Sequence, residues 1–291
     1  MASLPPAAPS GVQHTASGSA LPPAQTPTRA GSKRRRFASL RTVVALILRE
    51  MSTRYGRTPG GYIWAVLEPL AAILFLSLGF SLIIRTPSLG TSFLLFYATG
   101  YLPFTLYMQV SNTSAQALKF SKPLLKYPAV IWLDAILARF ILNSLTNIFV
   151  MLLLLTGILM VIDSRTVLDM PPVIEAVALS MLLALGVGTL NCVLMGLSPL
   201  WDVAWGILTR PLFLASGIFF LYDYLPPLGH GLLWYNPMMH LTGLVRTGFH
   251  PSSTTPHVNL TYVTLPSLAL SVPGISPLGG SHRDTLHRTA T

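Results

Sequence analysis

The most constraining feature of this sequence is a series of long apolar blocks that carry almost no charged side chains. The block that begins at Tyr62, for example, runs to Ile84 with Glu68 as its single charged residue. Helical blocks of about 18 residues or more match the hydrocarbon core of a bilayer. Only 10% of the residues are charged, whereas about 25% is usual in soluble domains. These features predict an all-α polytopic membrane protein.

The apolar blocks predict about six transmembrane helices, which cover residues 62–84, 93–110, 138–162, 173–197, 203–221 and 258–278. Gly186 and Gly188 in the fourth block permit close helix contact, so they indicate packing rather than ligand binding. The sixth block is long enough to cross a bilayer. However, it contains Pro266, Pro273 and Pro277, which make it a poor helix former.

Basic residues lie mainly between the apolar blocks and define an orientation. With the amino terminus in the cytoplasm, the basic residues from Arg29 to Arg57 and those of 119–126 lie inside, and only Arg85, Arg165 and Arg246 face outward. The positive-inside rule therefore favours this orientation.

The net charge of +10 also raises the alternative of nucleic-acid binding. Because the basic residues flank apolar blocks, anionic lipid headgroups account for them better than a nucleic acid does. Residues 1–36 are rich in Pro, Ala, Ser and Thr and end in the basic run Lys33–Arg36. They have no apolar run to bury, so we predict a disordered basic arm.

Residues 40–55 place apolar side chains at helical spacing with arginines between them, and the segment is too short to span a bilayer. This pattern predicts a helix at the cytoplasmic interface, followed by a hinge at 58–61. Glu68 then lies inside the first span, where a carboxylate needs a partner or a water-filled cavity. Alternatively, it extends to the headgroups. Arg210 in the fifth span also needs a partner, and Glu68 and Asp202 are the candidates.

Aromatic residues in the second block are spaced by three and four positions, which places them on one helix face: Tyr97, Tyr101, Phe104 and Tyr107. The stripe either packs against lipid and protein or offers a stacking surface for sugar rings. The segment 222–256 is too apolar and aromatic for a solvated loop. Because prolines interrupt it, we expect re-entrant or interfacial helices on the outer side, before the last span.

The motifs of common catalytic sites are absent from the sequence. It contains no G-x-x-x-x-G-K-[ST] run for ATP phosphates, no H-E-x-x-H and no C-x-x-C. The ten-residue spacing of His230, His240 and His250 suits no common metal site. We therefore expect no catalytic residue and no metal site, and interpret Cys192, the single cysteine, as a packing residue.

Three stretches resemble the membrane subunit of type-2 ABC transporters that export polysaccharides. They are R-E-M-S-T-R-Y-G-R with the following Glu68-Pro69, S-K-P-L-L-K-Y-P-A-V-I-W-L-D, and W-Y-N-P-M-M-H-L-T-G-L-V-R-T-G-F. The resemblance extends over about residues 40–251. The first stretch looks more like capsule exporters than like O-antigen exporters. The end of the chain departs from the family, in which a straight, strongly apolar sixth helix is expected, although His282-Arg283-Asp284 resembles its tail.

The resemblance implies that residues 37–291 form the membrane domain of an exporter of capsular or related polysaccharide, in lipid-linked form, in a bacterial inner membrane. It implies a homodimer and a separate ATPase subunit that binds ATP and Mg²⁺, while this chain binds no cofactor. Periplasmic and outer-membrane export proteins are further candidate partners, beside membrane lipids. The residues expected to couple to the ATPase are Lys119, Lys122, Lys126, Asp134, Arg49 and Arg54.

The same resemblance leads us to place five aromatic residues along the substrate path between two protomers: Tyr97, Tyr101, Tyr107, Tyr222 and Trp234. Glu68 and Arg210 are the candidates for a mobile polar contact near the entrance of this path. The alternatives are an exporter of O-antigen, teichoic acid or a small molecule, and a membrane-embedded glycosyltransferase or polymerase. The last class requires a catalytic acid or base and a large outer loop, and the sequence contains neither.

Overall fold

The computed structural model describes residues 38–55, 60–121, 132–162, 168–250 and 258–280, and all regular structure in these ranges is helical. The helices are α1 (Ala38–Tyr55), α2 (Gly61–Ile83), α3 (Phe93–Ala115), α4 (Ala117–Ser121), α5 (Trp132–Val161), α6 (Met170–Leu197), α7 (Leu200–Ala215), η1 (Tyr222–Tyr224), α8 (Pro227–Leu233), α9 (Pro237–Phe249) and α10 (Leu260–Gly280). The predicted arm 1–36 lies outside the described residues.

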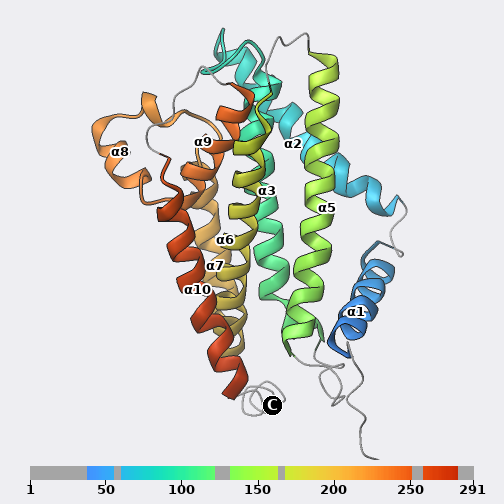
Figure 1. Ribbon diagram of the computed structural model, residues 1–291. Coiled ribbons are helices and arrows are strands. Elements are labelled where there is room, and N and C mark those ends of the chain that lie inside the picture. The colour runs from blue at the N-terminus through green and yellow to red at the C-terminus, as the bar shows by residue number, and fades with distance from the viewer. Residues whose placement is uncertain (1–37, 56–59, 122–131, 163–167, 251–257, 281–291) are drawn as a thin grey trace, which may run out of the picture. The chain divides into compact units, whose positions relative to one another are not determined.

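The long helices run side by side and alternate in direction along the chain (Figure 1). α1 lies at one end of the bundle beside the start of α5, and α8 and α9 lie at the other end. We refer to these as the α1 end and the α9 end. The prediction of an all-helical chain with a separate short helix before the first long one is confirmed.

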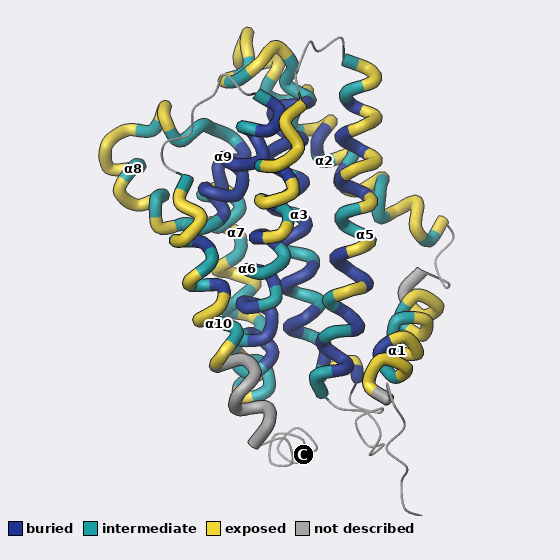
Figure 2. The backbone as a smooth tube through the Cα atoms, in the orientation of Figure 1, coloured by how far each residue is buried: buried dark blue, intermediate teal, exposed yellow. Residues whose placement is uncertain are grey.

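α3 and α6 form the centre of the bundle. α3 packs against α2, α5, α6 and α9, and α6 packs against α3, α9 and α10. Side chains such as Phe96, Tyr97 and Leu106 are therefore almost fully buried, and Figure 2 shows the burial concentrated on these central helices. Because neighbours surround α3, its residues cannot all face one pathway.

Glycines set the closest helix contacts in this centre. A Cβ atom at Gly188 would lie 2.8 Å from the Cβ of Ser114 and 2.9 Å from the carbonyl oxygen of Ser111, both on α3. A Cβ atom at Gly186 would collide with the carbonyl oxygen of Ser267 on α10. The interpretation of these two glycines as packing residues is confirmed.

The hinge before the first span has the backbone that its sequence suggests. Gly60 precedes α2 with φ of 90°, and Gly61 begins the helix with φ of 28°. Side chains other than glycine rarely adopt these values, so the glycine pair lets the chain turn sharply into α2. Pro69 lies within α2 and is buried, without ending the helix.

Among the described residues, three helices are long and apolar enough to cross a membrane: α2, α5 and α6. Within α10, Leu260–Val272 is a shorter apolar segment. α7 has 16 residues, about 24 Å, which is less than the hydrocarbon thickness of about 30 Å. The last part of α3 carries Gln109, Asn112 and Thr113, which lower its hydropathy. A polytopic membrane protein is confirmed, whereas six spans remain a prediction.

Several predicted boundaries are corrected by the structure. α5 begins at Trp132 rather than at 138, so Asp134 lies in a helix and not in a loop. α7 ends at Ala215 rather than at 221, because Gly217 takes a positive φ of 76°. Residues 260–280 form one helix despite their prolines, since α10 lies along α6 over much of its length.

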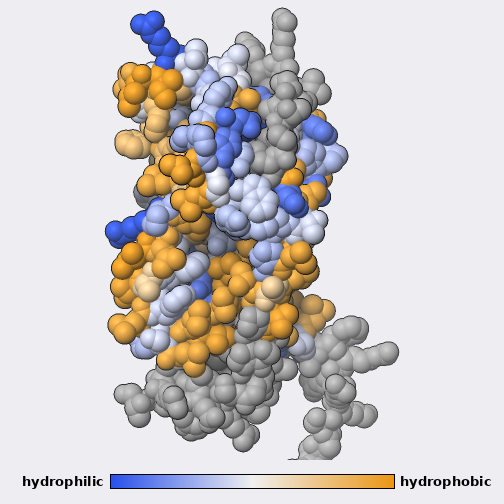
Figure 3. Space-filling view, turned by 90° about the vertical axis from the view of Figure 1, so that its left-hand side faces the viewer, coloured by the Kyte–Doolittle hydropathy of each residue, from blue (hydrophilic) through white to orange (hydrophobic). Residues whose placement is uncertain are grey.

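Large apolar side chains cover much of the surface. Phe75 and Leu82 on α2 are 78% and 83% exposed, and α7 contains no buried residue. On the face shown in Figure 3, hydrophobic side chains dominate the lower half and polar ones gather toward the upper half. A surface of this kind is suited to lipid contact rather than to water.

Candidate functional site

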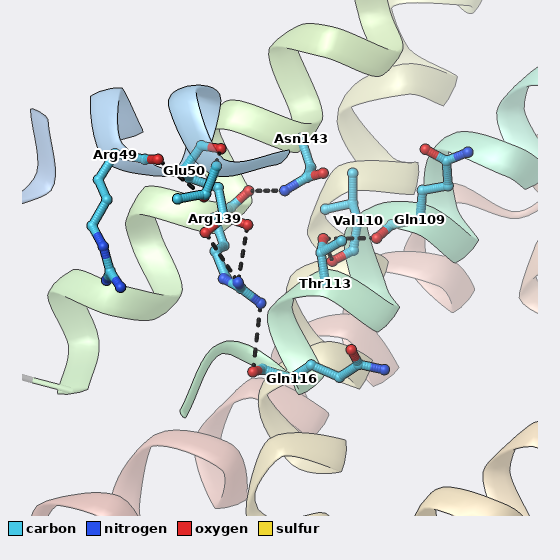
Figure 4. Close-up of polar contacts among 9 residues, drawn as sticks. Arg49, Glu50, Gln109, Val110, Thr113, Gln116, Arg139 and Asn143 are labelled. Atoms are coloured by element: carbon cyan, nitrogen blue, oxygen red, sulfur yellow. Dashed lines mark hydrogen bonds and ion pairs between the residues drawn. The ribbon is translucent and has the colours of Figure 1, made fainter. Parts of the chain in front are cut away.

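An ion pair joins α1 to α5 at the α1 end. Nη2 of Arg139 donates to both carboxylate oxygens of Glu50, at 2.9 and 3.0 Å. Nη1 donates to the carbonyl of Gln116 at 3.5 Å, and the guanidinium lies 4.6 Å from the centre of the Phe120 ring. Figure 4 shows the guanidinium between the Glu50 carboxylate and Gln116. The Arg139 side chain therefore connects α1, α4 and α5 with Gln116, the residue directly after α3.

A second polar contact joins the start of α1 to the start of α5. The hydroxyl of Ser39 donates to a carboxylate oxygen of Asp134 at 2.6 Å. Asp134 is only 3% exposed and lies in the first turn of α5. α1 is therefore tied to α5 near both of its ends, because Ser39 and Glu50 are 11 positions apart. A buried polar contact of this kind holds two helices in one register.

A pocket of about 460 Å³ opens beside the ion pair. α1 contributes Arg49, Glu50 and Thr53 to its wall, among other residues, and α5 contributes Arg139. Its remaining lining residues come from the end of α3 and from the segment after it: Thr113, Gln116, Phe120 and Ser121. Charged and hydroxyl groups thus form part of the lining, and Leu46, Ala135 and Ala138 add apolar surface to it.

The residues predicted to contact an ATPase have different surroundings. Lys119 on α4 is exposed and lies 3.6 Å from a carboxylate oxygen of Asp202 on α7. Arg49 is exposed and lines the pocket. Asp134 is buried in the first turn of α5, so it does not offer its carboxylate at the surface of the described chain. Lys122 and Lys126 fall outside the described residues, and the side chain of Arg54 is not described.

Glu68 and Arg210 are both exposed on the surface of the described chain. The two ion pairs among the described residues are Glu50 with Arg139 and Lys119 with Asp202. Asp202, one of the two suggested partners of Arg210, therefore binds Lys119 instead. Glu68 lies near Tyr101, close enough for the two side chains to interact electrostatically.

The aromatic residues of α3 do not form one free surface. Tyr97 and Tyr107 are 2% and 3% exposed, and the Tyr97 ring contacts Phe80 and Phe96 at 5.3 and 5.2 Å between centres. Tyr101 is half-buried, and its ring lies 6.3 Å from that of Phe213 on α7.

The two other aromatic candidates lie at the α9 end, and both are half-buried. The hydroxyl of Tyr222 donates to the carbonyl of His230 at 3.1 Å. The Trp234 ring contacts those of His240 and Tyr262, at 5.6 and 4.7 Å between centres, and these two rings are 5.3 Å apart. These contacts join η1 to α8, and the segment after α8 to the start of α10.

Arg246 on α9 is a buried arginine that the sequence patterns did not single out. It is 2% exposed, donates to the carbonyls of Ile218 and Phe220 at 3.1 Å each, and lies 4.2 Å above the Phe96 ring. Burial lowers the pKa of its guanidinium to about 9, so the group stays charged at neutral pH. The burial of His250 itself lowers the pKa of its imidazole, and the charge of Arg246 lowers that pKa further.

Sequence reasoning also missed the ion pair between Glu50 and Arg139. Glu50 is the only acid in the stretch 40–67, and Arg139 is the only basic residue of α5. A single acid in a basic helix and a single base in an apolar helix are a signal that the two could pair. The sequence gives no indication, however, that helices 89 positions apart meet at these residues.

The fold and this site define a polytopic α-helical membrane protein whose first helix is tied to one end of the bundle by polar contacts. The chain belongs to the ABC-2 type transporter family, whose model matches residues 41–250. It is the membrane permease component of such a transporter and not its ATPase.

Three relatives match most of their own length. The polysialic acid transport protein KpsM of Escherichia coli is 30% identical over 235 residues, which are 81% of this chain and 91% of the relative. The capsule polysaccharide export inner-membrane protein CtrC of Neisseria meningitidis serogroup B is 27% identical over 237 residues, 81% and 89% of the two chains. BexB of Haemophilus influenzae, described in the same words as CtrC, is 27% identical over 239 residues, with the same shares.

Proposed function

We propose that this chain is the permease subunit of an ATP-driven exporter of capsular or related cell-surface polysaccharide, and that the polysaccharide is lipid-linked. The observation that carries this proposal is the match to KpsM, CtrC and BexB, which covers about nine tenths of each relative. The family match, which covers residues 41–250, includes most of α1, the long helices α2, α3, α5 and α6, and all of α9. All three relatives are transport or export proteins by name, two of them of capsule polysaccharide.

The α1 end faces the cytoplasm in this proposal, with the amino terminus on that side of a bacterial inner membrane. The basic residues around α1 and α4 support this orientation, because such residues concentrate on the cytoplasmic side. A separate ATPase subunit, which binds ATP and Mg²⁺, docks on α1 and on the segment 117–131. Arg49, Arg54, Lys119, Lys122 and Lys126 offer it positive charge.

Movement of the ATPase reaches the spans through the contacts between α1 and α5. The ion pair of Glu50 with Arg139 and the bond of Ser39 with Asp134 make α1 follow the start of α5. α5 is one of the long apolar helices, so a displacement of α1 shifts a spanning segment. Asp134 acts in this proposal from within the protein rather than on the docking surface.

The substrate path lies between two copies of the chain. Glu68 on α2 and Arg210 on α7 are exposed on the surface of one copy, and charges inside apolar spans avoid lipid. Both side chains therefore face a second copy or a water-filled path, where they form the mobile polar contact. Tyr101, Tyr222 and Trp234 are half-buried and offer part of their rings to the polysaccharide. Tyr97 and Tyr107, which are buried, shape the path from behind.

Affinity purification from the native membrane tests this proposal, with a tag at the amino terminus and mass spectrometry of the bound proteins. We expect to recover a dimer of this chain together with a soluble subunit that contains a G-x-x-x-x-G-K-[ST] motif. The two polypeptides should be present in equal molar amounts. A variant with Arg49 and Lys119 both changed to glutamate is expected to lose most of that subunit while the dimer persists. An intact dimer that binds no such subunit would contradict the proposal.

A further inference from the structure

The end of α7 is an unusual place in the described chain, because a helix stops there within the bundle. α7 ends at Ala215, and residues 216–221 continue without regular structure to η1. The end of a helix leaves carbonyl groups without an intrahelical partner, and such groups are costly where water is scarce. Four carbonyls of this stretch receive a side-chain hydrogen bond, and all the donors belong to α9 or to the residue that caps it.

The donors form a row along α9. Asn236, the N-cap of α9, donates from Nδ2 to the carbonyl of Ala215 at 2.8 Å. Thr242 donates to the carbonyl of Ser216 at 2.9 Å. Arg246, one helical turn further, donates to the carbonyls of Ile218 and Phe220 at 3.1 Å each. Residues four positions apart share a helix face, so Thr242 and Arg246 present their donors to the same segment.

The surroundings of Arg246 are shaped around its guanidinium. A Cβ atom at Gly100 on α3 would lie 3.1 Å from Nη2 of Arg246 and 3.1 Å from the Cα of Ile218. Gly217 allows the chain to turn between the bonded carbonyls, with φ of 76°. The guanidinium forms no ion pair with the described acids, and carbonyl groups and the Phe96 ring stabilise its charge instead. A planar group with several donors is needed to reach two carbonyls at once.

The α1 end of α7 has a different set of contacts, and the two residues after Leu197 join it directly to the end of α6. No residue of α7 is buried. At its α1 end the ties are Trp201 to Asn191 at 2.9 Å, Trp205 to Asn112 at 3.1 Å, and the exposed ion pair of Asp202 with Lys119. The exposed ion pair contributes little, so the short connection to α6 and the two tryptophan hydrogen bonds hold this end. The α9 end has four bonds, of which those from Thr242 and Arg246 come from nearly fully buried residues.

We infer that Arg246 is a positioning residue for transport: it fixes the α9 end of α7 to α9, so that α7 tilts about this end when its α1 end moves. α7 carries the exposed Arg210, so the tilt changes where that charge lies. The link to transport rests on the proposed function, whereas the fixed end of α7 does not.

Distances between spin labels test the inference in a chain whose only cysteine, Cys192, is replaced by alanine. One label pair, at Leu214 on α7 and Ile174 on α6, reports the α9 end, and another, at Val203 on α7 and Leu145 on α5, reports the α1 end. All four positions are exposed. In the complex with its ATPase we expect a nucleotide analogue to shift the Val203 pair and to leave the Leu214 pair unchanged.

The variant Arg246→Met is expected to broaden the Leu214 distance in the chain alone in lipid nanodiscs. Export should fall by about tenfold, since one hydrogen bond to a charged group shifts two conformations by about that factor. ATP hydrolysis should continue. Arg246→Lys is expected not to restore the narrow distance, because its single nitrogen replaces the two nitrogens with which the guanidinium reaches the two carbonyls.

Thr242→Val removes one bond of the row and should broaden the same distance less. Thr247→Val is the matched control, since the Thr247 hydroxyl bonds only to the carbonyl of Leu244 on α9 itself.

If Arg246→Met does not fold, the comparison of Thr242→Val with Thr247→Val carries the test. An unchanged Leu214 distance in Arg246→Met or Thr242→Val would overturn the inference. So would a nucleotide-driven shift of the Leu214 pair as large as that of the Val203 pair. The nanodisc measurement needs neither ATPase nor polysaccharide, so it separates this outcome from a failure of the proposed function.

Discussion

Two buried arginines illustrate two ways of stabilising a charge in an apolar protein. Arg139 forms an ion pair with Glu50, and Arg246 is surrounded by carbonyl groups and an aromatic ring. A guanidinium without such partners would cost several kcal/mol in a medium of low polarity. Each arginine therefore holds a particular set of helices together, α1 with α5 in one case and α7 with α9 in the other.

The ion pair gives a prediction at the scale of a residue. Glu50→Gln should lower the free energy of unfolding by about 2 kcal/mol, because a partly buried guanidinium loses its carboxylate. The loss would be measured as a lower midpoint of thermal unfolding in detergent, together with weaker export. Arg139→Gln should have a similar effect, and the double variant should cost less than the sum of the two.

Lys119→Gln is the control for this prediction. The side chains of Lys119 and Asp202 are 73% and 44% exposed, whereas those of Arg139 and Glu50 are 10% and 22% exposed. Exposed pairs contribute roughly 0–1 kcal/mol, so Lys119→Gln should change the unfolding midpoint very little. Equal midpoints for Lys119→Gln and Glu50→Gln would show that burial of the Glu50 pair has no energetic weight.

At the scale of elements, α6 is the helix on which α3 and α10 are assembled. Its small residues allow the backbones to approach closely, which is how helices associate where lipid weakens the hydrophobic drive. The close contact of Gly186 with the Ser267 carbonyl also explains why a proline-containing segment forms α10. Packing along α6, together with hydroxyl groups such as those of Thr264 and Ser267 that donate to the preceding turn, supports the helix.

A pair of alanine variants on α6 tests this account. Gly186→Ala should push α10 away from α6 and lower the unfolding midpoint, since its Cβ atom would collide with the Ser267 backbone. Gly196→Ala is the matched change on the same helix, and no atom lies within 4 Å of its added Cβ. We expect it to be neutral, or stabilising by less than about 1 kcal/mol. A midpoint for Gly186→Ala that equals that of Gly196→Ala would contradict the close contact.

At the scale of the whole molecule, the sequence predicts what a bilayer demands of each helix separately. An uninterrupted apolar block had to be helical, so α2, α5 and α6 lie within a few residues of their predicted bounds, apart from the earlier start of α5. The separate helix α1 and the glycine hinge before α2 were also predictable, because periodicity and backbone freedom are local properties. These features required no knowledge of which helices meet.

The arrangement of helix faces could not be predicted from the same information. The aromatic spacing of α3 predicts one face, but not that α2, α5, α6 and α9 surround it and bury Tyr97 and Tyr107. The partner of Arg139 lies 89 positions away on a helix outside the spans. The hydrogen bonds of Arg246 depend on where α7 ends, and no periodicity in the sequence indicates that position. Contacts of this kind depend on tertiary packing and not on local pattern.

The measurement that tests the central claim most directly is ATP-driven polysaccharide transport into inverted inner-membrane vesicles. The vesicles would contain this chain and its copurified ATPase, and the polysaccharide would be added outside them. We predict that the polysaccharide becomes protected from an added degrading enzyme only with ATP, with both subunits and with an intact phosphate-binding lysine in the ATPase. ATP hydrolysis by an intact complex without any protected polysaccharide, or protection that does not need ATP, would contradict the claim.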